Sequence, residues 1–278
     1  MKVVDAHQHF WNYEPVKHSW ISDDMKVIQR DFLPQNLLPI YEENHVDQCV
    51  AVQADQTEAE TDFLLSLAEK YAFIGGVVGW VDLKSNDLEK RLEHYSQFDK
   101  LKGFRHVVQD EPDPNFMLGS DFQKGISLLH RYNFTYDILI FHHQLPATVE
   151  LARAFPNMKF VLDHIAKPDI KLGSVDDWAK HIKALGECQN VYCKVSGMVT
   201  EADWEFWKTE DLIPYLDIVF ENFGTDRIMF GSDWPVCLLA ADYKMMKSVL
   251  DTYISGFSKL EKNKVMGENA GSFYSLKD

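Results

Sequence analysis

The sequence is short of several features that define common classes of protein. It has four cysteines in 278 residues, none in a Cys-x-x-Cys pair, so neither a disulfide scaffold nor a thiolate zinc cluster is indicated. Lys and Arg number 28 against 43 Asp and Glu, without a basic stripe, which argues against a nucleic-acid partner. No apolar run approaches the roughly 18 residues of a membrane span or forms a signal-peptide core. We therefore expect a cytoplasmic protein without a membrane partner.

What is present is an alternation of short apolar runs and amphipathic stretches along the whole chain. The eight apolar runs are 3–9, 48–54, 73–81, 101–108, 135–141, 158–164, 190–196 and 227–232. Apolar residues at helical spacing fill 58–71, 88–98, 122–131, 145–154, 178–188 and 212–223. Continuous apolar strands are typical of a parallel sheet covered by helices. Eight such units predict an α/β fold, the closed (β/α)8 TIM barrel, which takes about 250 residues.

The organisation of the chain beyond this alternation is simple. Because neither a repeat nor a linker divides it, we predict one barrel domain over residues 1–278, closed by two or three helices within 238–278. Segment 12–39 follows the first strand and is long, aromatic and punctuated by proline. In a barrel it would lie over the mouth at the C-terminal ends of the strands, either as a lid or as an ordinary packed connection.

The strongest local signal is the pair of histidines, His7 and His9, at the end of the first predicted strand. Side chains alternate along a strand, so the two point to the same face, about 7 Å apart. In a barrel strand this face is the interior, and active sites form at the C-terminal end. Two imidazoles there can bind a metal or hold a carbonyl oxygen.

Three other predicted strands also end in polar residues where packing alone would favour apolar ones. His164 ends the sixth run, Asp233 follows the eighth, and the fourth carries Arg105 and continues to Gln109 just beyond it. Since the carboxyl ends of parallel barrel strands meet at one mouth, we expect His7, His9, His164 and Asp233 to converge there. That convergence predicts an active site.

The ordered set of motifs resembles the amidohydrolase superfamily, specifically the lactonase branch that contains L-fuconolactonases, L-rhamnono-lactonases and pyrone-dicarboxylate lactonases. The motifs span nearly the whole chain and are Asp5-Ala6-His7-Gln8-His9-Phe10-Trp11, Gly79-Trp80-Val81-Asp82-Leu83, Lys102-Gly103-Phe104-Arg105, Leu162-Asp163-His164-Ile165-Ala166-Lys167-Pro168 and Gly231-Ser232-Asp233-Trp234-Pro235. The resemblance implies a hydrolase acting on a carboxylic ester.

The resemblance also implies a role for each residue. His7 and His9 would polarise the lactone carbonyl, directly or through a metal, and His164 would stabilise the oxyanion or position the water. Asp233 would take a proton from the attacking water and return it to the leaving alkoxide. Residues near the strand ends would bind the substrate: Arg105, Lys167, Trp11, Trp80 and Gln109.

The metal content is predicted from a departure from the family pattern. Binuclear relatives bridge two metals with a carboxylated lysine at the end of the fourth or fifth strand. Here the fifth run ends in Phe141-His142-His143, and Lys102 precedes the fourth strand instead of ending it. We therefore expect at most one divalent metal, such as Zn²⁺, on His7, His9 and Asp233, with His142, His143 or His164 as a further ligand. Catalysis without a metal stays open.

Arginine is scarce, and this bears on the substrate. Of six arginines only Arg105 lies near a catalytic strand end, whereas a dicarboxylate lactone would call for several bidentate arginines. A neutral sugar lactone is therefore the predicted small-molecule partner. The alternatives are a mononuclear metal-dependent decarboxylase or amide hydrolase of the same superfamily, and a non-catalytic barrel that binds sugar acids. A homo-oligomer is compatible with the sequence.

Overall fold

The computed structural model describes residues 2–277 and contains one eight-stranded parallel sheet in the order β1 to β8. Its strands are β1 Val4–Gln8, β2 Gln48–Val52, β3 Ile74–Gly79, β4 Leu101–Val107, β5 Thr135–Leu139, β6 Phe160–Leu162, β7 Val191–Val195 and β8 Ile228–Phe230. The sheet closes where Gln8 pairs with Trp234 and the His9 N–H donates to the Trp234 carbonyl oxygen. The predicted (β/α)8 barrel is confirmed, and each predicted apolar run contains one strand.

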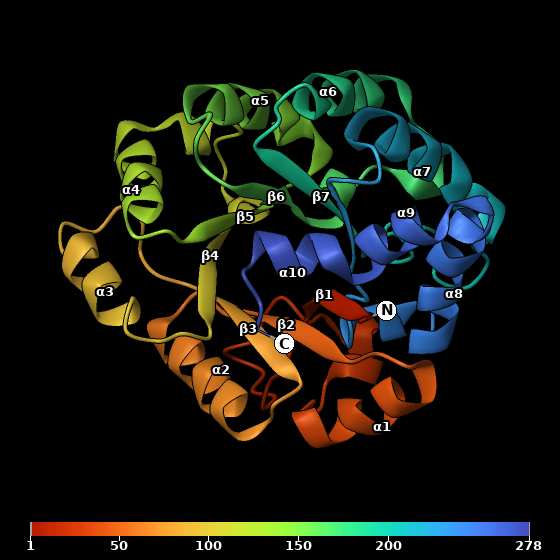
Figure 1. The fold of residues 1–278 in the computed structure, drawn as a ribbon, viewed down its shortest axis with the longest axis horizontal. Helices are drawn as coiled ribbons and strands as arrows, with labels where there is room; N and C mark the ends of the chain where they lie inside the picture. The colour runs from red at the N-terminus through yellow and green to blue at the C-terminus, as the bar shows by residue number, and fades with distance from the viewer. Residues whose placement is uncertain (1, 278) are drawn as a thin grey trace.

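Helices surround the ring of strands (Figure 1). They are α1 Pro34–Asn44, α2 Glu58–Lys70, α3 Leu88–Tyr95, α4 Ser120–Arg131, α5 Leu145–Ala154, α6 Asp176–Gly186, α7 Thr209–Phe223 and α8 Tyr243–Tyr253. Each buries a stripe: α4 buries Phe122, Ile126 and Leu129, the spacing of one helix face. Thr57 caps the start of α2 by accepting a hydrogen bond from the Glu60 N–H.

Short helical turns join these elements, and three more helical pieces end the chain. The 3-10 turns are η1 Asp23–Ile28, η2 Val108–Asp110, η3 Phe116–Leu118, η4 His142–Gln144, η5 Asp163–Ala166, η6 Ile170–Leu172, η7 Val236–Leu239 and η8 Ile254–Gly256. The closing pieces are α9 Lys259–Asn263, the π-helical turn η9 Lys264–Glu268 and α10 Asn269–Phe273. Among the helices of residues 2–277, none is long and apolar enough to cross a membrane.

Two apolar cores hold the barrel together. The larger lies between the strands and the outer helices, and the smaller fills the inside of the barrel. The inner core consists of Val4, Ala6, Val50, Val52, Val78, Val161 and Met229 together with Ala270, Phe273 and Tyr274. The last three belong to α10 and the residue after it, and α10 lies across the centre of the ring of strands (Figure 1). The predicted closing helices thus cover the N-terminal end of the barrel, an end that the sequence did not indicate, and leave the other end for chemistry.

The predicted lid segment, 12–39, is shorter than expected. Pro34 begins α1, because proline favours the first position of a helix, so residues 34–39 belong to that helix. The part of the segment before α1 is a loop, and an antiparallel bridge between Trp11 and Phe32 closes its base. Lys17 ties it to α2 through an ion pair of 2.7 Å with Glu60. The segment thus packs beside the C-terminal ends of β1 and β2.

Candidate active site

The first two site residues stand at the end of β1, where its pairing with β2 shifts register between Asp5 and Gln8. His7 and His9 lie side by side with their Nε2 atoms 3.2 Å apart. The Nδ1 atom of His9 is 2.8 Å from the carbonyl oxygen of Val52, which can only accept a hydrogen bond, so Nδ1 carries a proton. With Nδ1 bonded to Val52, the other ring nitrogen of His9, Nε2, faces the site.

Asp233 follows β8 and faces both histidines. Its N–H donates to the His7 carbonyl oxygen at 2.8 Å, and its φ of 57° is a left-handed conformation that aspartate tolerates. Its Oδ1 lies 3.3 Å from His9 Nε2 and 3.9 Å from His7 Nε2. Gly231 allows this approach, because a Cβ there would lie 2.8 Å from the Cβ of His7. The closure of the barrel between β1 and β8 thus brings the carboxylate to the imidazoles.

A left-handed turn after β6 carries His164. Residues 164–167 have φ values of 52°, 49°, 63° and 46°, and none of them is glycine. Such a backbone costs about 1–2 kcal/mol per residue, so the surrounding structure must hold it. Gly197 leaves space for the ring, because a Cβ there would lie 2.5 Å from His164 Nδ1. That Nδ1 is 2.9 Å from Ser196 Oγ, and Nε2 is 3.9 Å from Asp233 Oδ1.

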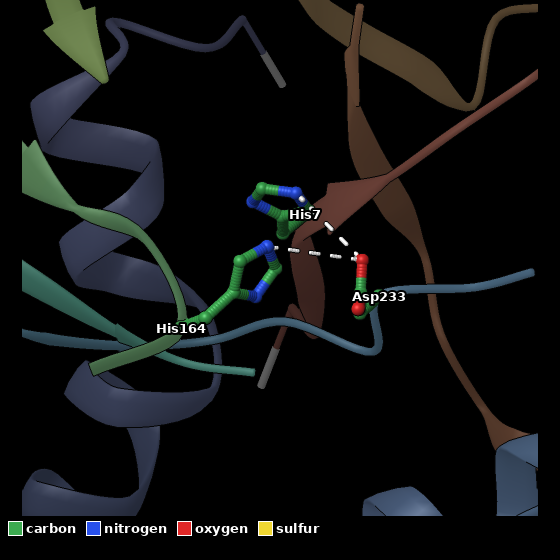
Figure 2. Close-up of side chains that lie close together, drawn as sticks. All are labelled: His7, His164 and Asp233. Atoms are coloured by element: carbon green, nitrogen blue, oxygen red, sulfur yellow. Dashed lines mark ion pairs between the residues drawn. The ribbon is translucent and has the colours of Figure 1, made fainter. Parts of the chain in front are cut away.

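These side chains form a set of donors suited to one metal ion. Figure 2 shows His7 and His164 directed toward Asp233, and the ligand atoms of these three residues all lie within 4.8 Å of one another. Two nitrogens bound tetrahedrally at about 2.05 Å would be about 3.3 Å apart, close to the separation of His7 and His9. His9 Nε2 also faces the Asp233 carboxylate at 3.3 Å, a position from which both can bind the same cation. The residues present therefore fit a single divalent metal.

Burial sets the charges of the site, since these four side chains are at most 6% exposed. Loss of solvation holds the pKa of His7 and of His164 well below the ordinary value, so both are neutral at pH 7. Burial opposes the charge of Asp233 as well, but His164, His9 and Lys167 outweigh it and hold the Asp233 pKa below its usual range. The site thus holds an ionised carboxylate beside the imidazoles, and this is the state of Asp233 that metal binding or base catalysis requires.

A layer of buried charge lies directly behind His7. Asp163 Oδ1 is 3.3 Å from His7 Nδ1, and Arg105 Nη1 is 3.1 Å from Asp163 Oδ2 and 3.3 Å from His7 Nε2. Lys194 on β7 contacts both His7 and Asp163, and the sequence analysis missed it. The sequence could have indicated Lys194 as a functional residue, because this lysine interrupts the apolar run Val-Tyr-Cys-Lys-Val at an interior position. Asp137 interrupts β5 in the same way.

The predicted substrate-binding residues occupy different settings. Arg105 is 4% exposed, and its terminal nitrogens contact Asp163, His7 and Gln53. Its binding of substrate stays a prediction. Trp80 Nε1 and Gln109 Oε1 are buried atoms without a hydrogen-bond partner among residues 2–277, which leaves them free to pair with a ligand.

Trp11 was predicted to offer a face to the substrate, and the structure buries it instead. The side chain has no exposed surface, and its indole N–H donates to the Arg30 carbonyl oxygen at 2.8 Å. It packs edge-to-face on Phe32, with ring centroids 5.6 Å apart. The indole therefore holds the base of the segment that begins at residue 12.

Lys167 and Glu201 form a pair on the approach to Asp233. The Lys167 Nζ is 3.8 Å from Glu201 Oε1, and the lysine is partly exposed. Burial raises the pKa of Glu201. The Lys167 ammonium lowers this pKa and the Asp233 carboxylate raises it, so the three charges interact electrostatically. Glu201 stands in a loop, Val-Thr-Glu-Ala, whose sequence carries no pattern that marks it as functional.

The two histidines after β5 do not join the donor set among the described residues. The strand ends at Leu139, and His142 and His143 belong to the turn η4 that follows it. His142 Nδ1 is 3.1 Å from the Lys167 carbonyl oxygen, while His143 is exposed. The third histidine is therefore His164. Lys102 contacts the Ser275 carbonyl oxygen at the opposite end of the barrel, away from any metal-bridging position.

The family of the chain follows from comparison with known proteins. The sequence model of the Amidohydrolase family matches residues 4–276. The chain belongs to the amidohydrolase family. This match covers every strand of the barrel and all four residues of the site.

Named relatives of this amidohydrolase support the resemblance to the lactonase branch. The L-fucono-1,5-lactonase of Burkholderia multivorans is 39% identical over 284 residues, which cover 98% of this chain and 96% of the relative. That of Burkholderia ambifaria is 34% identical and covers 98% and 95%. The crystal structure of an amidohydrolase from Burkholderia multivorans with bound zinc has a TM-score of 0.97 at 37% identity, over the full length of both chains.

Proposed function

We propose that this amidohydrolase opens the ester ring of a small neutral sugar lactone, an aldonolactone such as L-fuconolactone or L-rhamnonolactone, with Asp233 as the general base. The observation that carries the proposal is the position of Asp233, whose ionised carboxylate faces three imidazole Nε2 atoms at 3.3 to 3.9 Å. A module that only binds a sugar acid has no need of such a base. The relatives named L-fucono-1,5-lactonase support the substrate class.

The reaction follows from the chemistry of this set. Asp233 removes a proton from water while the water oxygen bonds to the lactone carbonyl carbon, and the carbonyl electrons move onto oxygen. Collapse of this tetrahedral intermediate breaks the ring C–O bond, and Asp233 returns its proton to the departing alkoxide. His164, whose Nε2 lies 3.9 Å from Asp233 Oδ1, would hold the attacking water. The product is an open-chain hydroxy acid, which ionises and acidifies the medium.

We further propose one Zn²⁺ held by His7, His9 and Asp233, which keeps the open position of a catalytic site. When bound, the metal supplies a Lewis acid that polarises the lactone carbonyl and stabilises charge on its oxygen. The orientation of His9 supports this, because the hydrogen bond from Nδ1 to Val52 directs the other nitrogen, Nε2, at Asp233. The Zn²⁺ bound to the related Burkholderia multivorans structure is of the kind that this donor set prefers.

Charge around the site supports a neutral substrate. The cations near Asp233 already have protein partners: Arg105 contacts Asp163, and Lys167 contacts Glu201. A dicarboxylate would need unpaired bidentate arginines. A sugar hydroxyl both donates and accepts, which suits Trp80 Nε1 and Gln109 Oε1 on the C-terminal side of β3 and β4. The four cysteines, all free and buried, support the cytoplasm as the place of the reaction.

A lactone panel tests the proposal. Acid release is followed with a pH indicator for neutral aldonolactones and for a dicarboxylate lactone, with the uncatalysed rate subtracted. We expect turnover of at least one neutral aldonolactone, with kcat/KM at least tenfold above that of the dicarboxylate. The absence of turnover throughout the panel, with binding of the corresponding acids, would leave a binding protein in place of the enzyme.

A further inference from the structure

The inside of this barrel holds charge where such barrels usually hold branched apolar side chains. Lys194, Asp137 and Asp163 all have no exposed surface, and Arg105 is 4% exposed. They project from β7, β5, β4 and the turn after β6. Buried ions are costly unless they are paired and hydrogen-bonded, so a cluster of this kind calls for a role beyond packing.

Lys194 stands at the centre of the cluster. Its Nζ lies 2.5 Å from Asp137 Oδ2, 3.0 Å from Asp163 Oδ1 and 3.2 Å from His7 Nδ1. The Nζ donates a hydrogen bond to Asp137 Oδ2 and forms an ion pair with Asp163 Oδ1, so two carboxylates match its charge. Lys194 and Asp163 together flank the Nδ1 side of the His7 ring, whose Nε2 faces Asp233 and His9.

The cluster continues to the other end of the barrel. The Tyr274 hydroxyl donates to Asp137 Oδ2 at 2.7 Å, and Tyr274 directly follows α10. The tyrosine is 1% exposed and belongs to the inner core. One line of contacts thus runs from the closing helix through Tyr274, Asp137 and Lys194 to His7. Among residues 2–277, Tyr274 makes one other hydrogen bond, from its N–H to the Ala270 carbonyl oxygen within α10. The hydroxyl of Tyr274 is thus its link toward the active site.

We propose that Lys194, anchored by Asp137 and Tyr274, is a positioning residue that fixes the plane of the His7 ring so that its Nε2 points at Asp233. The inference rests on the proposed function for its kinetic readout, but its metal readout is independent of turnover. Groups that orient a metal-binding histidine typically change metal affinity or activity by about 10–100-fold when removed. The closing helix thereby contributes to the geometry of the site as well as to stability.

Three purified variants test this role. Lys194→Met removes the ammonium and keeps an unbranched side chain, and Tyr274→Phe removes one hydroxyl and keeps the ring. Tyr136→Phe is the matched control, because Tyr136 is a fully buried tyrosine next to Asp137 whose ring packs outward on Phe122 and Phe160. Each protein is assayed for lactone hydrolysis, for Zn²⁺ affinity by competition with a chromophoric chelator, and for thermal unfolding.

We expect Lys194→Met to lower kcat and weaken Zn²⁺ binding by about 10–100-fold, with KM within threefold of wild type. Tyr274→Phe should lower kcat and weaken Zn²⁺ binding by about threefold to tenfold, the usual contribution of one hydrogen bond. Tyr136→Phe should match wild type. If Tyr274→Phe matched wild type while Lys194→Met lowered only the unfolding temperature, the cluster would be structural and the inference overturned.

The metal titration separates this inference from the proposed function. The wild type could fail to hydrolyse any lactone while Zn²⁺ affinity still falls from wild type to Tyr274→Phe to Lys194→Met. This result would contradict the proposed function and support the positioning role. Should Lys194→Met not fold, the graded loss in Tyr274→Phe against Tyr136→Phe still decides the question.

Discussion

Replacing Asp233 by asparagine removes the charge of the site with little change in its shape. Asparagine has the same heavy-atom outline as aspartate and tolerates the left-handed backbone at this position, where φ is 57°. The backbone hydrogen bond from residue 233 to the His7 carbonyl oxygen does not involve the side chain and is kept. The variant therefore isolates the loss of the base and of one anionic ligand.

The size of the effect follows from what the carboxylate does. Proton transfer by a positioned side chain contributes about 10²–10⁴-fold, so kcat for Asp233→Asn should fall by that factor. The pH dependence should change as well. Because the Asp233 pKa is held below its usual range, wild-type activity should be level from about pH 5 to 8 and fall only as the pH drops through that low pKa. The variant should lack this acid limb.

The assay is acid release from a neutral aldonolactone across this pH range, with folding checked by circular dichroism. Asp242→Asn is the control, since Asp242 accepts a hydrogen bond from Met245 N–H at the start of α8 and asparagine caps equally well. It should match wild type. Near-normal turnover by Asp233→Asn, with an unchanged pH profile, would refute the role of Asp233 and leave His164 as the proton acceptor.

Three further predictions concern the substrate, the metal and the fold around His164. The best dicarboxylate lactone should have a kcat/KM at least tenfold below that of the best neutral aldonolactone, because Arg105 and Lys167 are already paired. Elemental analysis should find one metal equivalent per chain, and chelation should lower the rate until Zn²⁺ is restored. Gly197→Ala should lose about 2–5 kcal/mol in urea unfolding, because its φ is 62° and a Cβ would meet the His164 ring.

Each of these has its own control or contrary outcome. A dicarboxylate lactone as the best substrate would reverse the charge assignment. Two metal equivalents with activity lost on their removal would indicate a binuclear site, which these residues do not provide. Gly256→Ala, where a Cβ has no neighbour within 4 Å, should change stability by no more than about 0.5 kcal/mol. Equal losses for the two glycine variants would contradict the account of the His164 turn.

The barrel could be predicted from the sequence because eight continuous apolar runs alternate with amphipathic stretches, and each run contains one strand. Continuous apolar runs mark strands buried on both faces, and the polar residues that follow them mark the mouth. His7, His9, His164 and Asp233 could be found in this way. The alternation argument was incomplete for His7, since the register shift in β1 lets both Ala6 and His7 contact the barrel interior.

The remaining features depend on contacts between distant segments. Trp11 resembles a stacking residue in sequence, and only its bridge to Phe32 shows that it is packed. His142 and His143 follow a strand as His164 does, but His142 contacts the Lys167 carbonyl oxygen and His143 is exposed. The role of Lys194 requires knowing that two other strands, β1 and β5, and one turn bring its neighbours to it. A charged residue within an apolar run is nevertheless a sign that sequence analysis can use.

The central claim, attack by a water that Asp233 activates, is tested most directly by one turnover in H₂¹⁸O with enzyme in excess over an aldonolactone. The account predicts one ¹⁸O atom in the carboxylate of the hydroxy acid and none in the peptide that contains Asp233. An unlabelled product with ¹⁸O in Asp233 would mean that the carboxylate itself attacks the lactone, and would contradict the mechanism.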